Sequence, residues 1–136
     1  MSKSGRYSAD RKKIEALSAA KTVEVHDCGT LFMTGDMNAT ITLPSAAAAG
    51  KGWWCKFILT ADLSAGDVIV TAAGLDTIEV VTVSAAGGAP DIAGTGQLNF
   101  VNTAATKGDQ IEFVTDGTSW YAVGHCAANT GIAANT

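Results

Sequence analysis

The sequence predicts an all-β fold, either an antiparallel β-sandwich or a jelly-roll-like barrel of about nine short strands. Apolar residues alternate with polar ones along short runs, and glycine-rich turns separate these runs; the chain has 15 glycines but only 2 prolines. No run is long enough for the helix that usually crosses between parallel strands, so the pattern favours antiparallel pairing. A chain of 136 residues is expected to form one domain with its own core.

The N-terminal segment differs from the rest because it is polar, basic and not alternating. We expect residues 1–20 to form a basic arm with a short helix over residues 9–17, for which Ser8 is the N-cap. Ile14 and Leu17 would share one face of this helix. Two apolar side chains are too few to hold a helix on a core, so we expect it to form on docking.

The alternating pattern begins at Lys21 and defines a sandwich domain over residues 21–126. The small, polar residues 127–136 are expected to form a flexible C-terminal tail. The predicted strands are residues 22–26, 30–33, 39–43, 53–59, 67–71, 77–83, 97–102, 108–115 and 118–124.

A hairpin turn is predicted between the last two strands. Asp116-Gly117 is a dipeptide that accepts the positive φ angles of a tight turn. The following Trp120 and Tyr121 point to opposite faces of the strand, because neighbouring side chains alternate. One of the two aromatic residues should therefore close the core, and the other should face outward.

A second aromatic pair lies in the strand predicted at residues 53–59, which is largely apolar on both faces. Such a strand is either central or covered by a partner chain. We expect Trp53, Trp54 and Tyr121 to contribute to an interface between copies of the chain, since aromatic residues are enriched in interface cores. A platform that stacks on sugars is the alternative interpretation of the outward aromatic residues.

His26, Cys28, His125 and Cys126 are the one candidate for a metal or thiol site. Imidazole and thiolate suit zinc, but the spacings match no familiar zinc module. Adjacent strand residues point apart, so His125 and Cys126 are poorly placed to act as a nucleophile and its base. The paired carboxylates lack the ligand order of a calcium loop. We therefore expect no metal, no cofactor and no enzymatic activity. A zinc or thiol hydrolase that uses these four residues is the alternative.

The charge is unevenly distributed along the chain. Residues 1–20 hold five basic and two acidic residues, whereas the rest hold four basic and eleven acidic ones, for a net charge of −4. This balance argues against nucleic acid as a partner, and no apolar run is long enough to span a membrane. A basic arm on an acidic body suggests docking on an acidic partner, with a solvated terminus as the alternative. The arm's basic residues are Lys3, Arg6, Arg11, Lys12 and Lys13.

The order of these motifs resembles a group of small virion proteins of tailed bacteriophages. In that group a TV…D-x-G-x-x-F opening leads to an x-T-I-T-L-P strand, an Ala-rich loop, a W-x-K-F-I strand and a terminal DGTxWYxxG hairpin. The similarity covers about residues 21–124 and is one of strand and turn pattern. The matching residues are Thr22, Val23, Asp27, Gly29, Phe32, the run 40–44, the run 56–58, Asp116, Gly117, Thr118, Trp120, Tyr121 and Gly124.

The resemblance implies a capsid decoration (cement) protein on the virion surface, synthesised in the host cytoplasm. Such a protein binds the major capsid protein, stabilises contacts between capsid subunits, and forms an oligomer, of which a trimer is favoured. The alternative implied by the same resemblance is a tail-fibre or spike domain that takes part in host receptor binding. His26 and Cys28 depart from the small or polar residues expected around the aspartate.

Overall fold

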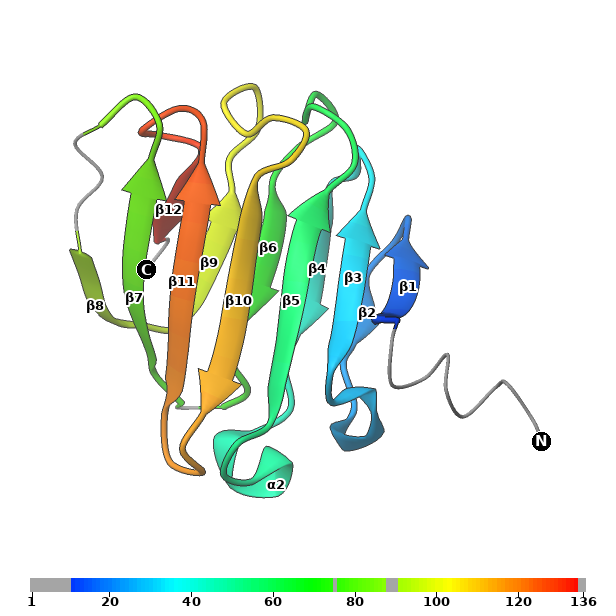
Figure 1. The fold of residues 1–136 in the computed structure, drawn as a ribbon, viewed down its shortest axis with the longest axis vertical. Helices are drawn as coiled ribbons and strands as arrows, with labels where there is room; N and C mark the ends of the chain where they lie inside the picture. Colours follow the sequence, from blue (N-terminus) through cyan, green and yellow to red (C-terminus); the bar gives the residue numbers. More distant parts are fainter. Residues whose placement is uncertain (1–10, 75, 88–90, 135–136) are drawn as a thin grey trace.

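Two stacked β-sheets make up the fold in a computed structural model, which describes residues 11–74, 76–87 and 91–134 (Figure 1). The seven-stranded sheet has the order β1 (Lys13–Leu17), β3 (Thr30–Thr34), β5 (Trp54–Leu59), β10 (Gln110–Thr115), β11 (Trp120–Cys126), β7 (Ile78–Ser84) and β8 (Asp91–Thr95). The five-stranded sheet has the order β12 (Ile132–Ala134), β9 (Gln97–Phe100), β6 (Val68–Thr71), β4 (Ala39–Thr42) and β2 (Lys21–Thr22).

The N-terminal part of the chain winds as a coil through both sheets. Odd-numbered strands β1, β3 and β5 lie side by side and parallel in the large sheet. Even-numbered strands β2, β4 and β6 do the same in the small sheet. Each turn of the chain thus adds one strand to each layer, and we call residues 13–71 the coil half.

The second half of the chain, residues 78–134, is built mainly from antiparallel pairs. β10 and β11 form a hairpin, and β10 also pairs with β5 of the coil half. In the small sheet β9 pairs antiparallel with both β6 and β12. β7 is the exception, because it lies parallel to β11. We call residues 78–134 the C-terminal half.

The core lies between the two sheets and follows the predicted alternation. Phe57 is fully buried and stacks on Phe32, with ring centroids 5.0 Å apart, and meets Phe113 edge to face at 5.8 Å. Trp53 and Trp120 form a second edge-to-face pair at 5.5 Å. These aromatic contacts join β3 and β5 of the coil half to the β10–β11 hairpin.

The all-β prediction is confirmed, but both sheets are mixed, so antiparallel pairing holds for only part of the fold. Parallel strands need a crossover connection. In the coil half that crossover is a strand of the opposite sheet, and no long helix is required. The structure has twelve strands in its described residues, and the helical pieces are one 3₁₀ turn at Val25–Asp27 and one turn of helix α2 at Ala46–Ala49. Neither is long or apolar enough to cross a membrane.

Both chain ends contribute strands where an arm and a tail were expected. The helix predicted over residues 9–17 is wrong for its described part, because Lys13–Leu17 is β1 and pairs with β3; residues 9 and 10 lie outside the described residues. A strand gains backbone hydrogen bonds and buries Leu17, whereas a helix would have had too few apolar contacts. Residues 132–134 of the expected tail form β12.

The strand predicted at residues 22–26 is shorter than expected. Lys21–Thr22 is β2, but the chain then turns, because the Asp27 carboxylate accepts the backbone N–H of Glu24 and closes the 3₁₀ turn. Val25 is consequently 45% exposed, where the alternation would have placed it beside the buried Val23.

Candidate interaction face

The outward surface of the seven-stranded sheet exposes large apolar side chains to solvent. We call it the outer face, and it points away from the small sheet. The alternation assigns these residues to it: Ile14 and Ala16 of β1, Leu31 and Met33 of β3, Trp54, Lys56 and Ile58 of β5, Gln110, Glu112 and Val114 of β10, Tyr121, Val123 and His125 of β11, and Glu79, Val81 and Val83 of β7.

Large apolar side chains are exposed along this face. Val81 and Val83 of β7 are 48% and 51% exposed, and Tyr121 and Val123 of β11 are 45% and 47% exposed. Ile14 lies at the other edge and is 55% exposed. A contiguous apolar patch of this kind is typical of a surface that binds a partner.

The small sheet's outward surface is different and serves as an internal comparison. Its residues include Thr22, Thr40, Thr42 and Thr71, which are exposed or half-buried. Hydroxyl-bearing residues suit a sheet that faces water on one side. Ile69 of β6 also faces outward but is half-buried, so in the described chain the large sheet has exposed large apolar side chains on its outward surface and the small sheet has none.

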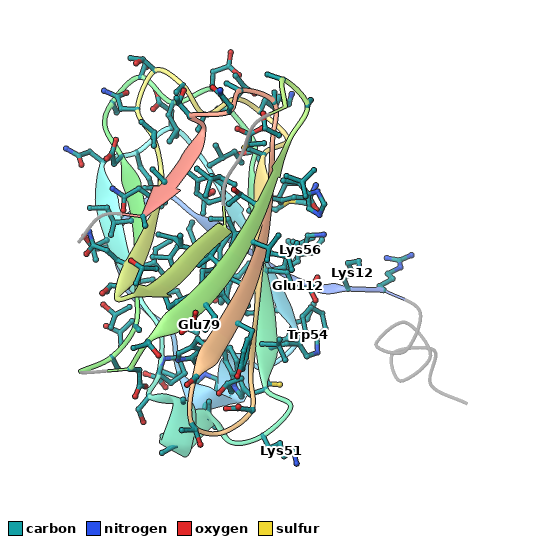
Figure 2. All side chains as sticks on the ribbon, turned by 90° about the vertical axis from the view of Figure 1, so that its left-hand side faces the viewer. Lys12, Lys51, Trp54, Lys56, Glu79 and Glu112 are labelled. Atoms are coloured by element: carbon teal, nitrogen blue, oxygen red, sulfur yellow. The ribbon has the colours of Figure 1, made fainter. Side chains whose placement is uncertain are left out.

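One basic and one acidic residue lie at the centre of the outer face. Lys56 of β5 and Glu112 of β10 are directly opposite each other across the antiparallel pair, and Glu112 is exposed while Lys56 is half-buried. Figure 2 shows Trp54, Lys56 and Glu112 projecting from the same side of the sheet, and Lys12 extending farther out on that side. No ion pair within 4.0 Å joins Lys56 to Glu112 in the described chain.

The aromatic residues predicted for an interface divide between core and outer face. Trp53 is 4% exposed, and its indole N–H donates to the carbonyl of Val25 over 2.7 Å, so the structure corrects its assignment to a contact surface. Trp54 is half-buried on the outer face and lies over Gly29, the residue that precedes β3. Trp120 is fully buried and Tyr121 is outward, as the hairpin prediction required of the pair.

The β10–β11 turn holds Tyr121 in place. It is a four-residue loop, longer than a two-residue turn, with Gly117 at a φ of +92°. The Asp116 carboxylate accepts the backbone N–H groups of Ser119 and Thr118, which lower its pKa. It also accepts the Tyr121 hydroxyl at 3.3 Å, and its negative charge raises the pKa of Tyr121.

The residues proposed for a metal or thiol site do not come together. Cys28 precedes β3 and Cys126 ends β11, and these strands run in the same direction, so the two thiols lie at opposite ends of the sheet. His125 is on the outer face, whereas Cys126 is buried and desolvation raises the pKa of its thiol. His26 lies beside Glu24, with 3.3 Å between Nδ1 and the carboxylate. No cluster of metal-ligating residues is found among the described residues.

The basic residues of the expected arm are only partly described. Arg11 and Lys12 are exposed immediately before β1. Lys13 is the first residue of β1, and its ammonium group donates to the carbonyl of His26 over 2.9 Å, so this cation is tied to the body of the protein. Lys3 and Arg6 lie outside the described residues.

Sequence reasoning did not identify the exposed valines Val81, Val83, Val114 and Val123 as candidate interface residues. Their signal was present in the run at 77–83, in β10 and in β11, where apolar residues occur at both alternating positions. Comparison of the chain with protein-family models, curated proteins and solved structures finds no match.

Proposed function

We propose that this chain is a decoration protein, which binds the outer surface of a bacteriophage head and stabilises contacts between major capsid subunits. The observation that carries the proposal is the exposed basic segment Arg11-Lys12 at the edge of an otherwise acidic chain. Lys12 extends from the side of the body to which the outer face points (Figure 2). Cations in this position are suited to acidic patches on a shell.

Two different surfaces make contacts in the proposed mechanism. The outer face joins copies of the chain through Trp54, Tyr121 and their apolar neighbours, and the basic segment contacts the shell. Each exposed charge contact is weak by itself. An oligomer carries several such segments, and simultaneous contacts to adjacent capsid subunits raise the overall affinity and link those subunits. No metal, cofactor or catalytic step is needed for this function.

A tail-fibre or spike domain that binds a host receptor is the second candidate, and the open end of the coil favours it. β1 and β2 are edge strands of the two sheets. A parallel coil grows by stacking further turns on such an edge, so a fibre shaft would continue there. The outward Trp54 would then be available for a glycan.

Sedimentation with undecorated heads of the same phage tests the proposal. The variant Arg11→Gln/Lys12→Gln is expected to bind heads about tenfold more weakly than the unchanged protein, because the charged contacts act together. The matched control Lys51→Gln/Lys107→Gln removes the same charge from two exposed lysines elsewhere and should bind normally. Equal binding by both variants would contradict the role of the basic segment. Binding to host cells but not to heads would favour the fibre domain.

A further inference from the structure

We propose that two copies of this chain pair face to face through their outer faces, about a two-fold axis that runs along the strands between β5 and β10. This inference concerns the contact between copies and does not depend on the decoration role. It replaces the trimer implied by the sequence resemblance with a pair.

The outer face is close to the size that such a contact needs. Six neighbouring strands, β1, β3, β5, β10, β11 and β7, contribute outward residues. At the usual strand spacing and rise they present a footprint of about 500 Å² before the relief of the side chains is counted. A standard-sized interface buries about 800 Å² of accessible surface per partner. Two twisted sheets pack in this way with their strands within about 30° of each other.

The charges at the centre determine the orientation of the pair. An axis along the strands, between β5 and β10, brings β5 of one copy over β10 of the other. Lys56 then faces the partner's Glu112, and Glu112 faces the partner's Lys56. An axis across the strands at the same level would instead place Lys56 on the partner's Lys56. Like charges brought together in this way cost several kcal/mol, so the charge pattern selects the first axis.

The apolar residues are arranged to match the same axis. Because Leu31, Lys56, Glu112 and Val123 lie in one row across the sheet, Leu31 falls on the partner's Val123. In the next row Trp54 falls on the partner's Val114, since Trp54 and Val114 are directly opposite in β5 and β10. The apolar residues of the coil half of the outer face thus contact apolar residues of the partner's C-terminal half.

The residues at the outer edges of the face are also paired by this two-fold axis. The register continues from Ile14 through Leu31 to Val81, so Ile14 falls on the partner's Val81. The central charges, the neighbouring apolar rows and the edges of the outer face therefore all meet complementary residues about the same two-fold axis.

Charge reversal provides the test. The full-length protein should sediment at twice the mass of one chain in analytical ultracentrifugation. Lys56→Glu gives a copy whose two central residues are both acidic, and Glu112→Lys gives one whose two are both basic. Each variant alone places like charges in both central contacts, and the dissociation constant of the pair should rise by about a hundredfold.

An equimolar mixture of the two variants should form the pair again, because Glu at 56 then faces Lys at 112 of the other copy, and Glu112 faces Lys56. Mixing leaves the charges within each copy unchanged, so recovery cannot come from repair of a folding defect. Lys51→Glu is the matched control: it changes the same charge at an exposed residue that lies at one end of the molecule, away from Lys56 and Glu112 (Figure 2), and it should leave the pair intact.

Three results would overturn the inference. Unchanged protein that stays monomeric at millimolar concentration would mean that the face binds a different partner. A mass of three chains would restore the trimer. Single reversals that pair as well as Lys51→Glu would show that Lys56 and Glu112 do not face each other across the contact.

Discussion

The coil half and the C-terminal half form the same two layers by different routes. In the coil half a strand finds its neighbour only after the chain has crossed to the other sheet and returned. In the C-terminal half the β10–β11 hairpin closes through a loop of four residues. Closing a long loop costs more conformational entropy than closing a short one. The coil half therefore depends more strongly on contacts that fasten one turn of the chain to another.

Aspartate side chains provide many of those contacts. In the coil half the Asp36 carboxylate, in the β3–β4 connection, accepts the backbone N–H groups of Ser64 and Ala65. In the C-terminal half Asp116 makes the same kind of contact within its own turn. The same kind of hydrogen bond, from a backbone N–H to an aspartate carboxylate, thus joins residues 28 positions apart in the coil half and three positions apart in the C-terminal half.

The largest effect is expected where the two halves meet, at Phe57. The change Phe57→Ala removes the ring that stacks on Phe32 of the coil half and meets Phe113 of the hairpin. A cavity in a fully buried aromatic cluster should lower the free energy of unfolding by about 3–5 kcal/mol. Urea denaturation followed by circular dichroism measures this change.

The neighbouring Ile58→Ala serves as control for Phe57→Ala, because Ile58 is in the same strand but faces outward. It should cost much less, measured at protein concentrations low enough to exclude pairing. Similar losses for the two variants would mean that the aromatic cluster does not hold the halves together.

A medium effect is expected at Asp67, which joins β6 of the coil half to the C-terminal half. Its carboxylate accepts the side-chain amide of Asn99 at 3.1 Å and the backbone N–H of Asn102 at 2.7 Å. Asn99 is 4% exposed, so Asp67→Ala leaves a buried donor without its partner. The free energy of unfolding should fall by about 1–3 kcal/mol.

The matched variant for Asp67→Ala is Asp62→Ala. Asp62 is exposed, and its carboxylate accepts the backbone N–H of Lys107 at 2.8 Å, so water can replace the lost bond. Urea midpoints of the two variants should differ clearly. If they coincide, burial of the Asn99 amide does not decide the strength of this connection.

The C-terminal half was the easier one to predict from sequence. Alternation in Gln110–Thr115 and Trp120–Cys126, with Asp116 and Gly117 between them, predicted the hairpin and that one of its two aromatic residues enters the core; the structure shows that this residue is Trp120. Those signals are local, because the two strands and their turn are contiguous. For β5, alternation separated two largely apolar faces but did not indicate which of them faces the core, and Trp53 was assigned to an interface although it is buried.

The coil half was harder, because alternation states which face of a strand is buried but not which strand lies next to it. The run 13–17 is too short to distinguish a strand from a helix until the edge of β3 is available to pair with it. Of the outer face, Trp54 and Tyr121 could be identified from sequence. The opposition of Lys56 and Glu112 could not, because it depends on the register between β5 and β10.

The smallest effect on stability is expected from neutralising the exposed turn aspartates Asp36 and Asp116. Because one lies in each half, the two losses compare how strongly each half depends on its aspartate. Hydrogen bonds from Ser64 lower the pKa of Asp36, and those from Ser119 and Thr118 lower the pKa of Asp116. A carboxyl group whose pKa is lower in the folded protein stabilises the fold above its unfolded pKa of about 3.9. This contribution is lost as the pH falls below that value through the folded pKa.

Asp36→Asn and Asp116→Asn should therefore lower the melting temperature at neutral pH, and the differences from the unchanged protein should shrink as the pH falls through this window. The loss should be larger for Asp36→Asn than for Asp116→Asn, because Asp36 holds a loop that is distant in sequence. The Asp116 turn keeps Gly117 and the bond from the Thr115 hydroxyl to the Ser119 carbonyl. Asp116→Asn should also bring the pKa of Tyr121 down toward its ordinary value, which ultraviolet titration in a Tyr7→Phe background measures. A larger loss at Asp116 than at Asp36 would show that the local turn, rather than the coil half, depends more on its aspartate.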